Sequence, residues 1–164
     1  MRSYFIYTSD NVWNCTEDES PYDKAIAFCD SIWILIDVEK RRLLRADALK
    51  YPIEEFTLPF ERISKVDINK DVLSKSGEFK GKDYYIDENG HVNNAAYADI
   101  ILDYKSMKES VCYFDITYEH EIMPDENIEV FSELSESGEK IIGIRKSDDI
   151  VCFCSEIKNP LNYN

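Results

Sequence analysis

The residues best suited to chemistry in this chain stand together in one short stretch. A carboxylate, three amides and an imidazole follow one another at Asp87, Asn89, His91, Asn93 and Asn94, around the turn-forming Glu88-Asn89-Gly90. Polar side chains gathered at this density point to a functional site. The alternative is purely structural, because Asn and Asp bond to local backbone groups in turns and His91 is then an ordinary polar residue.

The chemistry follows from what comes directly after this turn. A helix that begins there presents N–H groups without intrahelical partners, and these favour a developing negative charge. Acyl transfer to water needs such donors for the oxyanion, together with a carboxylate or imidazole that takes a proton from the attacking water. The stretch therefore predicts a site for hydrolysis of an acyl group.

The helix that positions this site is predicted by apolar spacing. Asn93 or Asn94 caps its start. Charged residues occupy the opposite face. Helical spacing relates Tyr97, Ile100, Ile101, Tyr104 and Met107.

Strands are predicted on both sides of the helix. An α+β layout follows, with one long helix and an antiparallel meander. Alternation at Cys152-Phe153-Cys154 places both thiols on one face. Between the early and later strands, a proline-interrupted stretch of mixed charge is expected to connect them over residues 48–76. The predicted strands cover residues 3–8, 25–38 and 78–86 before the helix, and 111–122, 128–134, 140–146 and 150–158 after it.

A faint internal repeat relates the two ends of the chain. Residues 5–11 followed by 25–31 are similar to residues 144–149 followed by 150–156, and both pairs suggest a hairpin that turns at Ser-Asp. If the repeat is real, the N-terminal strands belong to a second copy of the C-terminal fold that lacks its helix. Chance similarity explains the pattern equally well.

Composition excludes several partners. A net charge of −14 argues against nucleic acid and against a membrane surface, because both need clustered cations. No run reaches the roughly 20 apolar residues of a membrane span. The first residues lack a secretory pattern, so a cytoplasmic location is expected. The five cysteines lack metal-finger spacing, so we expect free thiols, no metal site and no cofactor.

Three motifs, taken together, resemble one family. Asp87-x-Asn89-Gly90-His91-Val92-Asn93-Asn94-x-x-Tyr97 is similar to the D-x-N-x-H-V-N-N signature of acyl-acyl-carrier-protein (acyl-ACP) thioesterases. Residues 31–42 resemble that family's tryptophan strand ending in I-D-x-x-x-R-R, and residues 116–122 resemble its Y-R-R-E-C strand. The resemblance implies a hotdog fold, an antiparallel sheet wrapped around one central helix, and in this family two such domains occur in tandem.

The same resemblance implies roles for individual residues. Asn89 and His91 would position the thioester carbonyl and the water, Glu121 would act as general base, and Asp87 would orient its neighbours. Asn93, Asn94 and Tyr97 would contact substrate. The family's cysteine after the glutamate is Ile122 here, so a thiol nucleophile at that position is excluded.

One of these roles conflicts with strand alternation. Phe114, Ile116, Tyr118, His120 and Ile122 form the apolar face of the predicted strand, and Glu121 falls on the opposite face. A β-bulge would re-aim Glu121. Without a bulge, His120 is the nearer candidate.

The expected organisation is a partial N-terminal hotdog over residues 1–47, a linker over 48–76 and a complete hotdog over 77–164. The expected activity is hydrolysis of acyl-ACP to free fatty acid. The alternatives are a single-hotdog acyl-CoA thioesterase and a non-catalytic acyl-binding or assembly protein, which the abbreviated first copy and acidic surface favour. An uncovered sheet edge predicts a homodimer.

Overall fold

The computed structural model describes residues 2–6, 27–31, 35–37, 39–40, 42–45 and 66–159. The chain divides into two compact units, residues 1–64 and 65–164. The Ser-Asp turn expected near residue 9 and most of the expected linker lie outside the described residues.

The described residues of the first unit form two antiparallel strand pairs. Tyr4 lies opposite Cys29 in one pair, which agrees with the expected pairing of these two segments. In the other pair, the Lys40 N–H donates to Asp37 Oδ1 over 3.0 Å at the turn. The pairs are β1 (Arg2–Ile6) with β2 (Ala27–Ser31), and β3 (Leu35–Asp37) with β4 (Arg42–Leu44).

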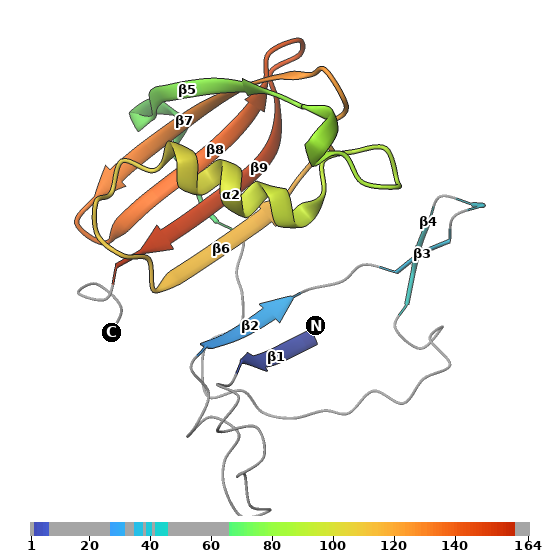
Figure 1. Cartoon of the computed structure of the whole chain (residues 1–164), viewed down its shortest axis with the longest axis horizontal. Helices are drawn as coiled ribbons and strands as arrows, with labels where there is room; N and C mark the ends of the chain where they lie inside the picture. Colours follow the sequence, from blue (N-terminus) through green and yellow to red (C-terminus); the bar gives the residue numbers. More distant parts are fainter. Residues whose placement is uncertain are drawn as a thin grey trace, which may run out of the picture. The chain divides into compact units, whose positions relative to one another are not determined.

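The second unit is a five-stranded antiparallel sheet with one helix across a face (Figure 1). The strands stand in the order β5-β7-β8-β9-β6, so β5 and β6 form the two edges. This is the hotdog arrangement, and the expected fold class is confirmed. Among the described residues, no helix has the length and apolar character needed to cross a membrane. The elements are β5 (Ser74–Lys80), α2 (Asn94–Tyr104), β6 (Tyr113–Tyr118), β7 (Asn127–Ser135), β8 (Gly138–Arg145) and β9 (Ile150–Lys158), with short 3₁₀ helices η2 (Lys70–Val72) and η3 (Asp83–Tyr85).

Helix α2 begins at Asn94, the second residue of the Asn93-Asn94 pair. Asn93 is the N-cap, and its side-chain oxygen accepts the N–H of Ala95 over 2.8 Å. The helix then buries Tyr97, Ile100 and Ile101 against the sheet. The expected helix is confirmed at its start and on its buried face, although Met107 lies three residues beyond its end.

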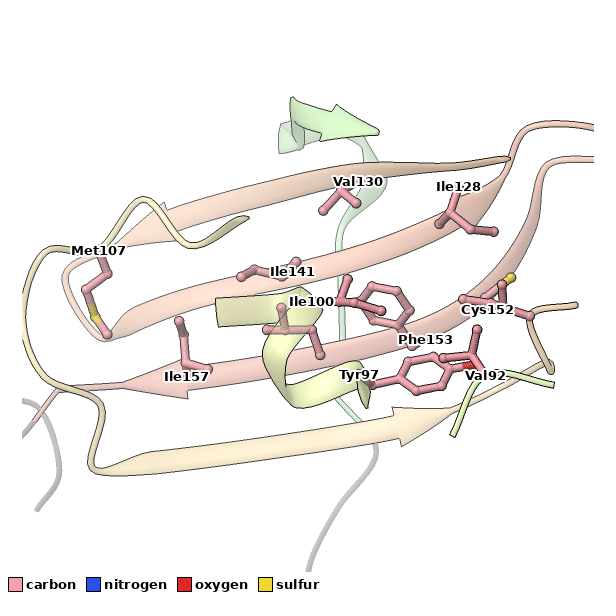
Figure 2. Packing of buried hydrophobic residues seen from close by; sticks show 12 residues of the cluster. Val92, Tyr97, Ile100, Met107, Ile128, Val130, Ile141, Cys152, Phe153 and Ile157 are labelled. Carbon is pink, nitrogen blue, oxygen red and sulfur yellow. The ribbon is translucent and has the colours of Figure 1, made fainter. Parts of the chain in front are cut away.

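The sheet supplies the other half of this core (Figure 2). Its buried residues come from the face that α2 covers, and they are Ile128, Val130, Ile141, Cys152, Phe153 and Ile157. Gly143 makes room for the largest of them. A Cβ atom at Gly143 would lie 2.1 Å from the Phe153 ring, so only glycine lets this ring lie flat on β8.

The opposite face of the sheet carries a second, smaller cluster. Ile142 and Cys154 pack there with Val66. Cys152, in contrast, belongs to the cluster under α2. The expectation that both thiols share a face is therefore wrong. A register shift is the reason, because Gly143 pairs with Phe153 and the next residue of β8 pairs with Val151, which leaves Cys152 as an extra residue in β9.

One expected strand differs in extent at both ends. Over residues 78–86, the strand ends at Lys80, which lies opposite Asn127, the first residue of β7. The chain closes local bonds instead, as in Tyr85 N–H to the Lys82 carbonyl at 2.9 Å. Strand β5 also starts earlier than expected, at Ser74, so the sheet includes the last residues of the expected linker.

A buried carboxylate stabilises the exit from α2. Glu139 is fully buried on β8, and its side chain accepts the N–H of Ser106 at 2.8 Å and of Met107 at 2.9 Å. The helix ends at Tyr104 with Lys105 as C-cap, so these are the first N–H groups beyond it. Glu139 thereby fixes Met107 in the core without a further helical turn.

Replacement of this carboxylate tests its role. We expect Glu139→Ala to lower the free energy of unfolding by about 1–3 kcal/mol, because it leaves the buried Met107 N–H without an acceptor. Glu139→Gln keeps one acceptor oxygen, so its free energy of unfolding should fall by less. Urea titration followed by circular dichroism measures both values, and equal losses for the two variants would contradict this account.

Candidate active site

The site loop joins the end of η3 to the start of α2 and is closed by backbone hydrogen bonds. The Asp87 N–H donates to the His91 carbonyl, and the Gly90 N–H donates to the Asp87 carbonyl, both over 3.0 Å. Gly90 has a φ of 85°, in the left-handed region that glycine occupies without steric cost. The polar turn read from the sequence is therefore present.

Asp87 is held inside this turn by Asn89. The carboxylate accepts the Asn89 backbone N–H at 2.8 Å and its side-chain amide at 3.2 Å. Burial raises the pKa of Asp87, but these two hydrogen bonds and the nearby His91 outweigh burial, so its pKa lies below its usual value. Asp87 is thus ionised at neutral pH, and the Asn89 amide is occupied with holding it.

His91 lies between two carboxylates. Its Nδ1 atom is 3.8 Å from Asp87 Oδ1 and 3.4 Å from the Val92 carbonyl oxygen. On the other side of the ring, Nε2 is 3.7 Å from Glu121 Oε1. Both carboxylate distances exceed hydrogen-bond range.

A bulge at the end of β6 brings Glu121 to this position. The N–H groups of Glu119 and His120 both donate to the Cys152 carbonyl, at 2.8 and 3.1 Å, so two residues face one. The expected strand over 111–122 therefore stops at Tyr118. Beyond the bulge, the Ile122 carbonyl accepts the Val92 N–H over 2.8 Å, which joins the segment that carries Glu121 to the loop that carries His91.

The bulge also separates Glu121 from His120. Glu121 faces His91 with 71% of its side chain exposed, while His120 Nδ1 donates to the Val151 carbonyl over 2.9 Å. The geometry thus favours Glu121 over His120 as the partner of His91.

A cavity of about 250 Å³ opens beside His91. Three of its lining residues were not among the expected site residues, namely Val92, Tyr118 and Glu119, and a fourth, His120, was the expected alternative to Glu121. Asn89 and Asn93 do not line it, since the first holds Asp87 and the second caps α2. The full lining is His91, Val92, Asn94, Tyr97, Tyr118, Glu119, His120 and Glu121.

Tyr118 is the main residue that sequence reasoning missed. Its hydroxyl donates to the Asn94 carbonyl over 3.1 Å, and its ring stands edge-on to Tyr97 with 5.1 Å between the ring centroids. The available signal was its place three residues before Glu121, at the apolar end of a strand. Tyr118 thereby joins the end of β6 to the first turn of α2.

The first turn of α2 also offers a donor. The N–H of Ala95 is bonded to the Asn93 side chain and that of Ala96 to the Asn93 carbonyl. Asn94 lines the cavity, and no described residue accepts its N–H. Such a group at a helix start suits a developing oxyanion. Among the described residues, no three His, Cys, Asp or Glu side chains are grouped as metal ligands.

The low pKa of Asp87 makes the loop sensitive to acid. Because the folded state lowers this pKa, the ionised carboxylate stabilises the fold above the unfolded value of about 3.9, and this contribution is lost as pH falls through the folded pKa. We expect wild type to be more stable than Asp87→Asn at pH 6, with the difference shrinking below about pH 4. Denaturant unfolding at several pH values measures this difference in stability. Asp83→Asn, at an exposed position, is the control for loss of one charge. A stability difference between wild type and Asp87→Asn that does not change with pH would contradict the lowered pKa of Asp87.

Comparison with known proteins identifies the family. The family model described as acyl-ACP thioesterase C-terminal domain matches residues 65–158, more than half of the chain. No curated protein sequence matches.

Two solved structures share the fold. An acyl-ACP thioesterase from Bacteroides thetaiotaomicron has a TM-score of 0.63 at 21% identity, covering 75% of this chain and 52% of that one. A putative oleoyl thioesterase from Lactobacillus plantarum has a TM-score of 0.51 at 18% identity, covering 76% and 54%. The chain thus spans about half the length of each. The polar loop, the hotdog sheet and the family match agree, and the chain belongs to the acyl-ACP thioesterase family through its C-terminal domain.

Proposed function

We propose that the chain hydrolyses fatty acyl thioesters at the cavity beside His91. The alignment of Asp87, His91 and Glu121 is the observation that carries this proposal, with neighbouring atoms 3.8 and 3.7 Å apart on the two sides of the imidazole. A base, an orienting carboxylate and a helix start around one cavity are the groups that acyl transfer to water needs.

The reaction proceeds by addition of water to the thioester carbonyl. Glu121 takes a proton from the water, whose oxygen forms a bond to the carbonyl carbon. His91 and the Asn94 N–H hold the oxyanion. The C–S bond then breaks, the thiolate takes up the proton, and a carboxylic acid and a thiol leave. Asp87 orients His91, and Asn89 in turn fixes Asp87 through its two hydrogen bonds.

The proposed carrier is acyl carrier protein, with coenzyme A as the alternative. Family membership supports the first. The net charge of −14 works against a fast encounter with any acidic carrier. Under this proposal the product is a free fatty acid, and the reaction belongs to fatty acid biosynthesis in the cytoplasm.

We also propose that the strands within residues 1–47 belong to a partial second hotdog, and that the linker expected over 48–76 ends before Ser74, where β5 begins. Structural alignment to the Bacteroides thioesterase supports this, because it covers 75% of the chain, a larger share than residues 65–164 provide alone. The antiparallel pairing of β1 with β2 fits the same interpretation.

The function is tested by thiol release from acyl-ACP and acyl-CoA. We expect turnover by wild type, and a loss of about 10²–10⁴-fold in kcat/KM for His91→Ala and for Glu121→Gln, because each removes a group that acts on the water or the carbonyl. The preferred carrier is the one with the higher kcat/KM.

The second histidine provides the matched comparison. His120→Ala also removes an imidazole from the cavity, but it leaves His91, which faces Glu121, in place. The loss of kcat/KM should therefore be much smaller for His120→Ala than for His91→Ala. Equal losses would overturn the assignment of His91 and Glu121. Acyl-thioester binding without turnover by wild type would support the non-catalytic alternative.

A homodimer is proposed on the basis of the sheet edges. Strands β5 and β6 end the sheet, and none of the described strands pairs with the outer side of β6. Open edges of this kind tend to be covered by another chain. Light scattering should therefore give a mass twice that of the 19.2 kDa chain. A mass equal to one chain at all concentrations would contradict the proposal.

A further inference from the structure

We propose that Tyr97 closes the inner end of the cavity and restricts the site to short acyl chains. This inference rests on the proposed thioesterase function and names its substrate class. His91, Glu119 and Glu121 give the cavity polar walls, and Glu121, with 71% of its side chain exposed, lies toward the solvent. Tyr97 lines the same cavity but is only 2% exposed, so it forms the inner limit.

The space behind Tyr97 is filled. Its ring stands edge-on to Phe153, with 5.5 Å between centroids, and Phe153 is fully buried on Gly143 (Figure 2). Ile100 packs in the same part of the core, and the buried Val92 lines the cavity together with Tyr97. An acyl chain that enters beside His91 therefore meets the Tyr97 ring and has no path deeper between α2 and the sheet.

Tyr97 is also held firmly in place. Its ring contacts Tyr118 on one side and Phe153 on the other, both at an interplanar angle of 87°. Tyr118 is itself fixed by the hydrogen bond from its hydroxyl to the Asn94 carbonyl. Edge-to-face pairs of this kind stabilise one ring orientation, so the ring cannot swing aside without breaking the pair.

The cavity volume sets the length that fits. Pockets that hold drug-sized ligands have volumes of about 300–1,000 Å³. At about 250 Å³ the cavity lies below this range, so it has room for a short chain only. A hexanoyl chain fits this space. A dodecanoyl chain would meet Tyr97 and hold its carbonyl away from His91 and Glu121.

The experiment compares hexanoyl and dodecanoyl thioesters on the preferred carrier. We expect wild type to favour hexanoyl at least tenfold in kcat/KM. Tyr97→Ala should lower this ratio at least tenfold, because each methylene that becomes buried in the space opened contributes a factor of about four. Tyr97→Phe keeps the ring and should keep the wild-type ratio.

Ile101→Ala is the matched control for loss of core packing. Ile101 lies on the same helix and is fully buried, but it does not line the cavity. This variant should be less stable in thermal unfolding and should keep the wild-type ratio. If Tyr97→Ala does not fold, Tyr97→Leu shortens the side chain at smaller cost and should move the ratio in the same direction.

The outcomes separate this inference from the proposed function. Turnover with no preference for hexanoyl, or with a ratio unchanged in folded Tyr97→Ala or Tyr97→Leu, overturns the role of Tyr97 and leaves the hydrolase assignment intact. If wild type shows no turnover, the hydrolase assignment fails. The Kd values of hexanoyl-CoA and dodecanoyl-CoA are then compared in place of kcat/KM. Tighter binding of dodecanoyl-CoA by wild type then overturns the inference.

Discussion

One backbone hydrogen bond holds the two halves of the candidate site together. The Val92 N–H donates to the Ile122 carbonyl over 2.8 Å, and each of these residues directly follows a residue of the proposed catalytic pair, His91 and Glu121. Val92 and Ile122 are almost fully buried in the core under α2, so this bond is shielded from water and is costly to break. The 3.7 Å approach of His91 to Glu121 depends on it.

The bulge at Cys152 makes this bond possible. A regular β6 would continue its alternation past Tyr118, and Glu121 would then face away from the loop. Because the Cys152 carbonyl accepts two successive N–H groups, β6 ends and the chain turns toward Val92. A separate register shift between β8 and β9 leaves Cys152 as an extra residue in β9 and places its thiol under α2, where burial raises its pKa to about 11. The thiol is thus protonated at neutral pH and serves packing.

The polar loop combines local and tertiary support. The turn is formed by local side-chain and backbone hydrogen bonds of Asp87, Asn89 and Gly90. These residue types favour turns, so the sequence predicts it. Asn93 caps α2, whereas its neighbour Asn94 lines the cavity. Tyr118 then ties the helix start to β6, and Tyr97 with Phe153 fills the space behind.

The sequence by itself determined the α+β layout, the start of α2 and the bounds of β9, because helical spacing, an asparagine cap and a strand-like run over residues 150–158 are local signals. The hotdog class was implied by the resemblance of its motifs to acyl-ACP thioesterases. The sequence also placed Asp87, Asn89 and His91 in one loop, since they are neighbours in the chain. Tertiary structure alone decided that Glu121 and not His120 faces His91, and that Cys152 and Cys154 lie on opposite faces. Both depend on where one strand gains a residue relative to its partner, and that is a property of the pairing between strands, which no single segment encodes.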